Sequence, residues 1–165
     1  MVKTELGIKV ADEVFIATAL LHREQPRRED FTIGEIVERA QKENLSGELR
    51  PGVRVHASLH CVANRPPNPG RYAMLYATAG NARRLVLAGD DVHPGRTGKI
   101  FPDPEDVPVA YRPLIDWARR RYAAKAAPTR SRWLDGLLQL SGTGGELWKG
   151  VDADEYVRQL RAGWK

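Results

Sequence analysis

Cysteine occurs only once in this chain of 165 residues, at Cys61, so the fold cannot be held by an internal disulfide. The sequence also has no run of about 18 apolar residues, the length that a membrane-spanning helix needs. No charged and apolar leader precedes the first helix-like segment, which begins at Val10. We therefore expect a soluble, cytoplasmic protein that has no membrane partner and forms one hydrophobic core of ordinary size.

Residue clusters that support catalysis are equally scarce. No pair of carboxylates stands out from the ordinary acidic residues of helix surfaces. Cys61 has a neighbouring histidine, His60, but adjacent residues on a helix point in different directions, so we predict that Cys61 is a small core residue. The glycine-rich stretch 141–145 lacks the Lys-Ser/Thr pair of a phosphate-binding loop and is interpreted as a flexible hinge. We therefore expect that the protein is not an enzyme.

Two histidines have the spacing of metal ligands. His56 and His60 lie four residues apart, which can bring two imidazoles to one side of a helix. A third ligand would have to be Cys61, about 100° around the helix from His60, or the distant His93. Structural zinc needs four protein ligands and catalytic zinc three. We therefore predict no metal site and no cofactor.

Positive charge is concentrated in two blocks of the sequence. Residues 50–100 carry eight Lys and Arg against two Asp, a net charge of +6, and residues 112–132 carry seven against one, again +6. Arginine predominates in both blocks, and its guanidinium group matches the geometry of phosphate oxygens. The blocks are therefore typical of a phosphate-binding face, although the same charges would also serve a solubilising surface.

Helical periodicity is clear in the first part of the chain. Residues 10–24 place apolar side chains at intervals of three and four residues, which predicts a largely buried helix. Thr32 and Glu35 form a capping-box pattern, and a second helix is predicted to follow them as far as about Asn44.

A third helix is predicted over residues 51–64. Pro51 suits a first helical turn, and Val55, Leu59 and Val62 are spaced as a buried stripe. If these three residues face the core, the polar and basic residues between them lie on the outer side.

Two β-rich runs follow, at residues 71–78 and 83–88, and the Gly-Asn turn between them predicts a hairpin. Residues 89–103 have no clear periodicity and are interpreted as a loop. A fourth helix is predicted over residues 104–124, and a final amphipathic helix over residues 151–164. The apolar side of the fourth helix is assigned to Val109, Leu114, Trp117, Ala118 and Tyr122.

These elements predict a mainly α fold with a small β-hairpin, in the α+β class. We expect three parts: a core at residues 1–103, a bridging basic helix at residues 104–125, and a partner-binding tail at residues 126–165.

Three helices followed by a hairpin is the element order of winged helix-turn-helix domains, which the chain resembles from about residue 9 to residue 90. In that family the third helix enters the major groove of DNA, and the hairpin wing approaches the backbone or the minor groove. The resemblance implies that DNA is bound by Arg50, Arg54, His56, Ser58, His60, Arg65, Arg83 and Arg84. The alternative is a solvated third helix and a hairpin that only completes the sheet.

The last 25 residues resemble the C-terminal tail of bacterial type II antitoxins. The shared features are a glycine-rich joint, a Leu-Trp pair, an Asp-rich helix start, and a Tyr-x3-Leu-Arg stretch that ends in Trp. In that family the tail wraps a partner toxin, for which a PIN-type ribonuclease is one candidate. The resemblance implies toxin contacts at Leu147, Trp148, Tyr156, Leu160, Arg161 and Trp164. The alternatives are a final helix that docks on the chain's own core and a helix that forms a homodimer.

Together the two resemblances predict a DNA-binding, antitoxin-type transcriptional regulator whose tail neutralises a toxin. A possible homodimer would suit a symmetric operator. The alternative function is a winged-helix-like adaptor or structural protein without a toxin partner, which contacts protein or RNA instead.

Overall fold

The computed structural model of the protein describes residues 7–48 and 50–126, together with residues 158, 159 and 161. The chain divides into two compact units, Met1–Ala127 and Pro128–Lys165. In the second unit the three described residues are helical and exposed.

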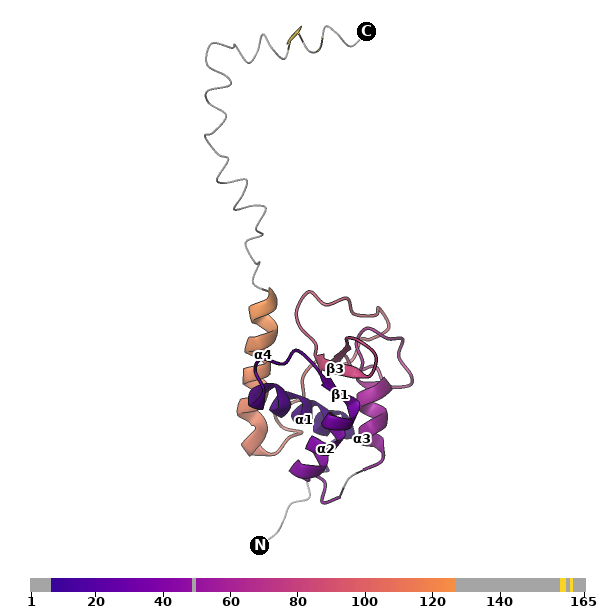
Figure 1. Ribbon diagram of the computed structural model, residues 1–165, viewed down its shortest axis with the longest axis vertical. Coiled ribbons are helices and arrows are strands. Elements are labelled where there is room, and N and C mark those ends of the chain that lie inside the picture. Colours follow the sequence, from indigo (N-terminus) through magenta and orange to yellow (C-terminus); the bar gives the residue numbers. More distant parts are fainter. Residues whose placement is uncertain (1–6, 49, 127–157, 160, 162–165) are drawn as a thin grey trace. The chain divides into compact units, whose positions relative to one another are not determined.

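The first unit is an α+β fold in which α1 occupies the centre (Figure 1). Its elements, in chain order, are α1 (Val10–Glu24), β1 (Phe31–Thr32), α2 (Ile33–Glu43), α3 (Gly52–Val55), the π-helical turn η1 (His56–His60), β2 (Leu75–Ala77), β3 (Ala82–Leu85), the 3₁₀ turn η2 (Val109–Tyr111) and α4 (Arg112–Ala126). Helix α1 contacts α2, α3, η1, β3 and α4, so most of its surface is covered. The predicted fold class, mainly α with a small hairpin, is confirmed at this level.

The prediction of a largely buried first helix is also confirmed, and two of its buried residues are acidic. Asp12 and Glu13 lie in the interior of the protein. Lys99 Nζ lies 3.1 Å from Asp12 Oδ1, and Arg50 Nη2 lies 2.6 Å from Glu13 Oε2. Burying a charge without a partner is costly, so these ion pairs fix Lys99 and Arg50 against α1.

The sheet has three antiparallel strands in the order β1-β3-β2. The predicted hairpin is present as β2 and β3, with Tyr76 opposite Arg84. Strand β1 was not predicted, because two residues are too few to show the alternation that marks a strand. It pairs Phe31 with Arg83 and Thr32 with Ala82, and so joins the start of α2 to the hairpin.

The capping box at the start of α2 is confirmed. Thr32 Oγ1 accepts a hydrogen bond from the backbone N–H of Glu35, and Glu35 Oε2 accepts one from the backbone N–H of Thr32. Arg28 binds both carboxylate oxygens of Glu35. Arg28 and then Thr32 lower the pKa of Glu35 to about 2, which keeps this carboxylate charged near the helix N-terminus.

The third helix differs from its prediction in length and in orientation. It spans residues 52–60 and ends in η1, and Val55 and Leu59 are 41% and 39% exposed. The buried stripe is made by Val53, Ala57 and Cys61 instead. These small side chains allow the helix to pack closely on α1, and a Cβ at Gly52 would lie 3.5 Å from Val10. The expectation that Val55 and Leu59 face the core is therefore wrong, whereas Val62 is buried.

The fourth helix begins at Arg112 and not near residue 104. Pro108 disfavours helical backbone in the residue before it and lacks an N–H for the helix, and Val109 is 70% exposed. Leu114 and Ala118 are buried in the same core as α1, as is Ile115. The helix expected to bridge two parts of the chain therefore packs into the first unit.

Among the described residues, no helix combines the length and the apolar character needed to cross a membrane.

His22, near the end of α1, is a buried histidine that is kept neutral. Its Nε2 accepts a hydrogen bond from the backbone N–H of Leu85 at 3.3 Å, and its ring packs edge-on against Phe31. Burial, followed by the charges of Arg121 and Arg84, lowers the pKa of His22 to about 3. The unfolded chain binds a proton at a pKa of about 6.5.

We expect His22 to make the protein less stable in mild acid. Below about pH 6.5 His22 binds a proton in the unfolded state, whereas in the folded state it stays neutral down to about pH 3. The free energy of unfolding therefore decreases as the pH is lowered through this window. The slope from this residue should approach about 1.4 kcal/mol per pH unit. Urea unfolding from pH 7 to pH 4.5 would measure it.

His22→Gln is the control, because glutamine keeps an acceptor for Leu85 and does not titrate. The variant should be less stable at pH 7 but lose stability less steeply towards pH 4.5. Equal slopes in the two proteins would contradict the prediction.

Candidate nucleic-acid interface

The outer face of α3 and η1 is the surface to which the winged-helix resemblance assigns the predicted base contacts. Arg54 is exposed there, Ser58 is half-buried, and Val55 and Leu59 lie on the same exposed side. Arg65, just beyond the helix, is exposed as well. The face therefore offers two arginines and a hydroxyl, with two apolar side chains between them.

Two buried arginines hold the end of this helix. The last carbonyls of a helix have no partner within it. Here Arg83 donates from Nε to Ala57 O at 3.2 Å and from Nη2 to Ser58 O at 3.4 Å. Arg96 donates from Nη2 to Leu59 O and from Nη1 to His60 O, at 2.7 and 2.6 Å. All four terminal carbonyls are thus satisfied by guanidinium groups, whose positive charge also suits a helix C-terminus.

Arg96 also connects the segment from Arg65 to Tyr72 to the end of η1. It also donates to the carbonyls of Arg65, Pro66, Gly70 and Tyr72. The side chain is 5% exposed and has no carboxylate partner among the described residues. Its charge is therefore solvated by backbone dipoles, in place of water.

Arg83 does not lie where the winged-helix resemblance implies. It is 2% exposed, and its donors face the backbone of η1 and of its own hairpin. It lies on β3 with its side chain on the same buried face of the strand as Leu85, because alternate side chains of a strand share a face. In this conformation Arg83 has no donor to offer to a phosphate, and its role is to support the helix.

Arg84 and Arg50 are engaged in ion pairs. Arg84 binds both oxygens of Asp90, at 2.6 and 2.7 Å, and lies over the ring of Tyr76. Arg50 donates from Nε and Nη2 to the buried carboxylate of Glu13. Both arginines are therefore compensated, and Arg50 belongs to the packing of α1.

His56 and His60 form a pair at the inner edge of the same helix. Their rings meet edge-to-face with centroids 4.8 Å apart, and His56 Nδ1 lies 2.9 Å from Gly52 O. Burial lowers the pKa of His56, so its ring is neutral near pH 7. In the described part of the chain, no group of three or more His, Cys, Asp or Glu residues could hold a metal ion.

Cys61 lies in the core directly after η1. Burial raises the pKa of its thiol to about 12, so the reactive thiolate is absent near pH 7. The interpretation of Cys61 as a core residue agrees with this burial.

The tail residues assigned to toxin contacts mostly lie outside the described residues. Arg161 is described and is helical and exposed, and Arg158 and Gln159 are likewise helical and exposed. Leu147, Trp148, Tyr156, Leu160 and Trp164 are not among the described positions.

No pattern in the sequence indicated that Arg96 would hold the end of η1. It lies in a loop without periodicity, where its charge alone indicates nothing about burial. Two glycines, Gly95 and Gly98, flank it in the sequence, and in the structure a Cβ at Gly98 would lie 2.6 Å from Arg71 O and one at Gly95 3.0 Å from Pro67. Glycines so placed allow the loop that carries Arg96 to pack closely on the segment from Pro67 to Tyr72.

No protein-family model, curated protein or solved structure matches the chain.

We expect Arg96→Met to destabilise the protein by about 3 kcal/mol or more, because it leaves several buried carbonyls without donors. Arg96→Lys should recover less than half of this loss, since one ammonium cannot reach carbonyls on all sides. Urea unfolding measures both effects. Arg54→Met is the matched control on the exposed face, and its stability should change by no more than about 0.5 kcal/mol. A neutral Arg96→Met would show that the carbonyls find other partners.

Proposed function

We propose that the protein is a DNA-binding regulator of the antitoxin type. The outer face of α3 and η1 would contact DNA, and the C-terminal segment would bind and neutralise a toxin. The observation that supports DNA binding best is the order α1, β1, α2, α3, β2, β3, together with the solvent-facing polar side chains of the third helix. This order is compatible with a winged-helix arrangement, in which that helix reads the major groove.

Arg54 and Arg65 are the cations best placed for this role. Both are exposed, and no carboxylate of the described residues lies within ion-pair distance of either. Arginine forms paired hydrogen bonds with guanine edges and with phosphate oxygens, and Ser58 can bond to either. Arg83 and Arg96 would contribute indirectly, because a helix whose end is fixed loses little conformational freedom on binding.

The tail part of the proposal depends on its resemblance to antitoxin tails and on its composition. Tryptophan, tyrosine and arginine are the residues that anchor most protein interfaces, and the last 25 residues contain all three. A toxin of the PIN ribonuclease type would offer acidic side chains, with which Arg161 can pair. A homodimer would place two copies of the third helix on a symmetric site.

The exposure of Val55 and Leu59 supports a second candidate function. Apolar side chains in the middle of the outer face suit contact with a protein at least as well as contact with thymine methyl groups. The protein would then be an adaptor with a winged-helix-like core, and the basic residues around the face would meet RNA or an acidic partner.

We expect Arg54→Ala and Arg65→Ala to weaken binding to duplex DNA. Each lost phosphate contact should reduce the slope of log affinity against log salt concentration by about 0.9, and a lost base contact should cost about 1–3 kcal/mol. Fluorescence anisotropy with labelled duplexes selected from genomic fragments, at several salt concentrations, measures both.

Arg120→Ala is the control for this experiment, because Arg120 is exposed on α4 and lies outside the proposed face. If the Arg54→Ala/Arg65→Ala double variant binds as the parent does, DNA does not use this face. If Val55→Ser/Leu59→Ser abolishes binding to a protein partner while both arginine variants are neutral, the adaptor function is favoured.

We expect deletion of residues 141–165 to abolish toxin binding and to leave DNA affinity and the thermal midpoint unchanged. The measurement is a pull-down of the tagged protein from its native cytoplasm after nuclease treatment. A small ribonuclease recovered in stoichiometric amount with the full chain, and lost on deletion, is the expected result. A large fall in the thermal midpoint would instead show that the tail docks on its own core.

A further inference from the structure

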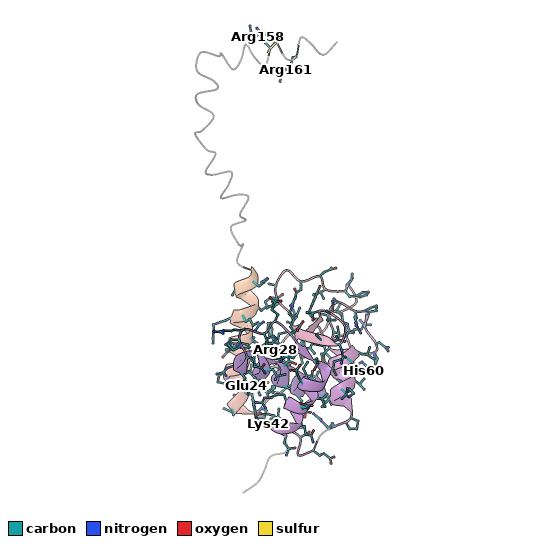
Figure 2. The ribbon with its side chains drawn as sticks, in the orientation of Figure 1. Glu24, Arg28, Lys42, His60, Arg158 and Arg161 are labelled. Atoms are coloured by element: carbon teal, nitrogen blue, oxygen red, sulfur yellow. The ribbon has the colours of Figure 1, made fainter. Side chains whose placement is uncertain are left out.

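A basic surface pocket lies beside the C-terminal half of α4. It encloses about 400 Å³, and three segments form it: the loop after α1, the end of β3 with the residues after it, and α4. Its lining residues are Pro26, Arg27, Arg28, Glu29, Arg84, Leu87, Arg121 and Lys125. Arg28, which lines the pocket, and His60, at the end of η1, are well separated in the fold (Figure 2).

Positive charge exceeds negative charge in this pocket even after ion pairing. Glu35 neutralises Arg28, and Asp90 neutralises Arg84. Arg27, Arg121 and Lys125 have no carboxylate within 4.0 Å among the described residues. These three cations face one remaining acid, Glu29, so the lining keeps an excess of two positive charges.

Arg121 and Arg84 form the inner part of the cluster. Arg121 is half-buried, and its pKa is lowered by burial and then by the charge of Arg84. Both groups also act on His22 beneath them, whose pKa they lower. Like charges held together in a partly desolvated place repel each other, and a bound anion would relieve this repulsion.

The guanidinium groups of Arg84 and Arg121 also lie near aromatic rings. Asp90 and the ring of Tyr76 fix Arg84, with the guanidinium carbon 4.4 Å from the ring centroid. Arg121 lies 5.8 Å from the centroid of Trp117. A guanidinium group such as that of Arg121 can form paired hydrogen bonds with phosphate oxygens.

We propose that this pocket binds the phosphate group of a small phosphorylated ligand, with Arg121 as the principal donor and Arg27 and Lys125 as supporting charges, beside Arg84, which Asp90 already neutralises. A volume of about 400 Å³ is near the lower end of small-molecule sites, and a lining dominated by charged groups selects a compact anion over an apolar molecule. The site is separate from the outer face of α3 and η1, and it does not depend on DNA binding there.

The test is isothermal titration of the full chain with inorganic pyrophosphate, at an ionic strength held constant with sodium chloride. The expected result is saturable binding at one site per chain. Arg121→Gln/Lys125→Gln should weaken it at least tenfold. Neither residue makes an ion pair in the described structure, so the variant should fold, and without ligand its thermal midpoint should be equal to or above that of the parent.

Arg119→Gln/Arg120→Gln is the matched control. It removes two arginines that are exposed on the same helix and do not line the pocket, so net charge changes equally. Its affinity for pyrophosphate should stay within twofold of the parent. The proposal is overturned if both double variants bind pyrophosphate equally, or if the parent shows no saturable binding.

A short DNA duplex distinguishes the source of the phosphate. If the pocket serves a small ligand, Arg121→Gln/Lys125→Gln should bind a 12-base-pair duplex as the control double variant does. If it loses duplex affinity as strongly as pyrophosphate affinity, the pocket holds a nucleic-acid phosphate, and the small-ligand proposal fails.

Discussion

The hydrogen bonds from Arg83 and Arg96 to the last carbonyls of η1 are the interaction on which the rest of the structure depends. They end the third helix, seat it on the sheet through β3, and gather the loops between residues 65 and 96 around it. A helix of nine residues has little stability of its own, so its outer face keeps its shape only through these tertiary contacts. Within the described part of the chain, neither arginine has a carboxylate beside it, and backbone dipoles supply the negative end of each contact.

Buried charged side chains also position neighbouring segments around α1, where the buried groups are acidic and bind cations. Asp12 and Glu13 are buried acids, and each fixes a segment that has no regular structure of its own: Lys99 from the long loop, and Arg50 from the approach to α3. The apolar core gives the unit most of its stability, whereas buried charged groups decide where its irregular segments lie. In a chain with long loops and short strands, such contacts replace the ladder hydrogen bonds that a larger sheet would provide.

Local signals in the sequence predicted the elements that depend on local physics. The ends of α1, the capping box of Thr32 and Glu35, and the hairpin all follow from periodicity, capping and turn chemistry. The orientation of the third helix does not, because two apolar stripes compete in it and close packing selects the one with smaller side chains. Arg83 shares the buried face of β3 with Leu85, and the sequence gives no local reason to expect an arginine on a buried face. For the basic pocket, three separate segments must come together before Arg27, Arg84 and Arg121 become neighbours.

The long reach of Arg96 sets an order of events during synthesis. Its guanidinium bonds to carbonyls that precede it by 24 to 37 residues, so the third helix remains incomplete until residue 96 has left the ribosome. A nascent chain that has released only the helix and the hairpin still lacks the guanidinium donor for the carbonyls of Leu59 and His60. The two arginines therefore leave the ribosome in sequence, first Arg83 and then Arg96, and all four carbonyls at the end of the helix have their guanidinium donors only after the second has emerged.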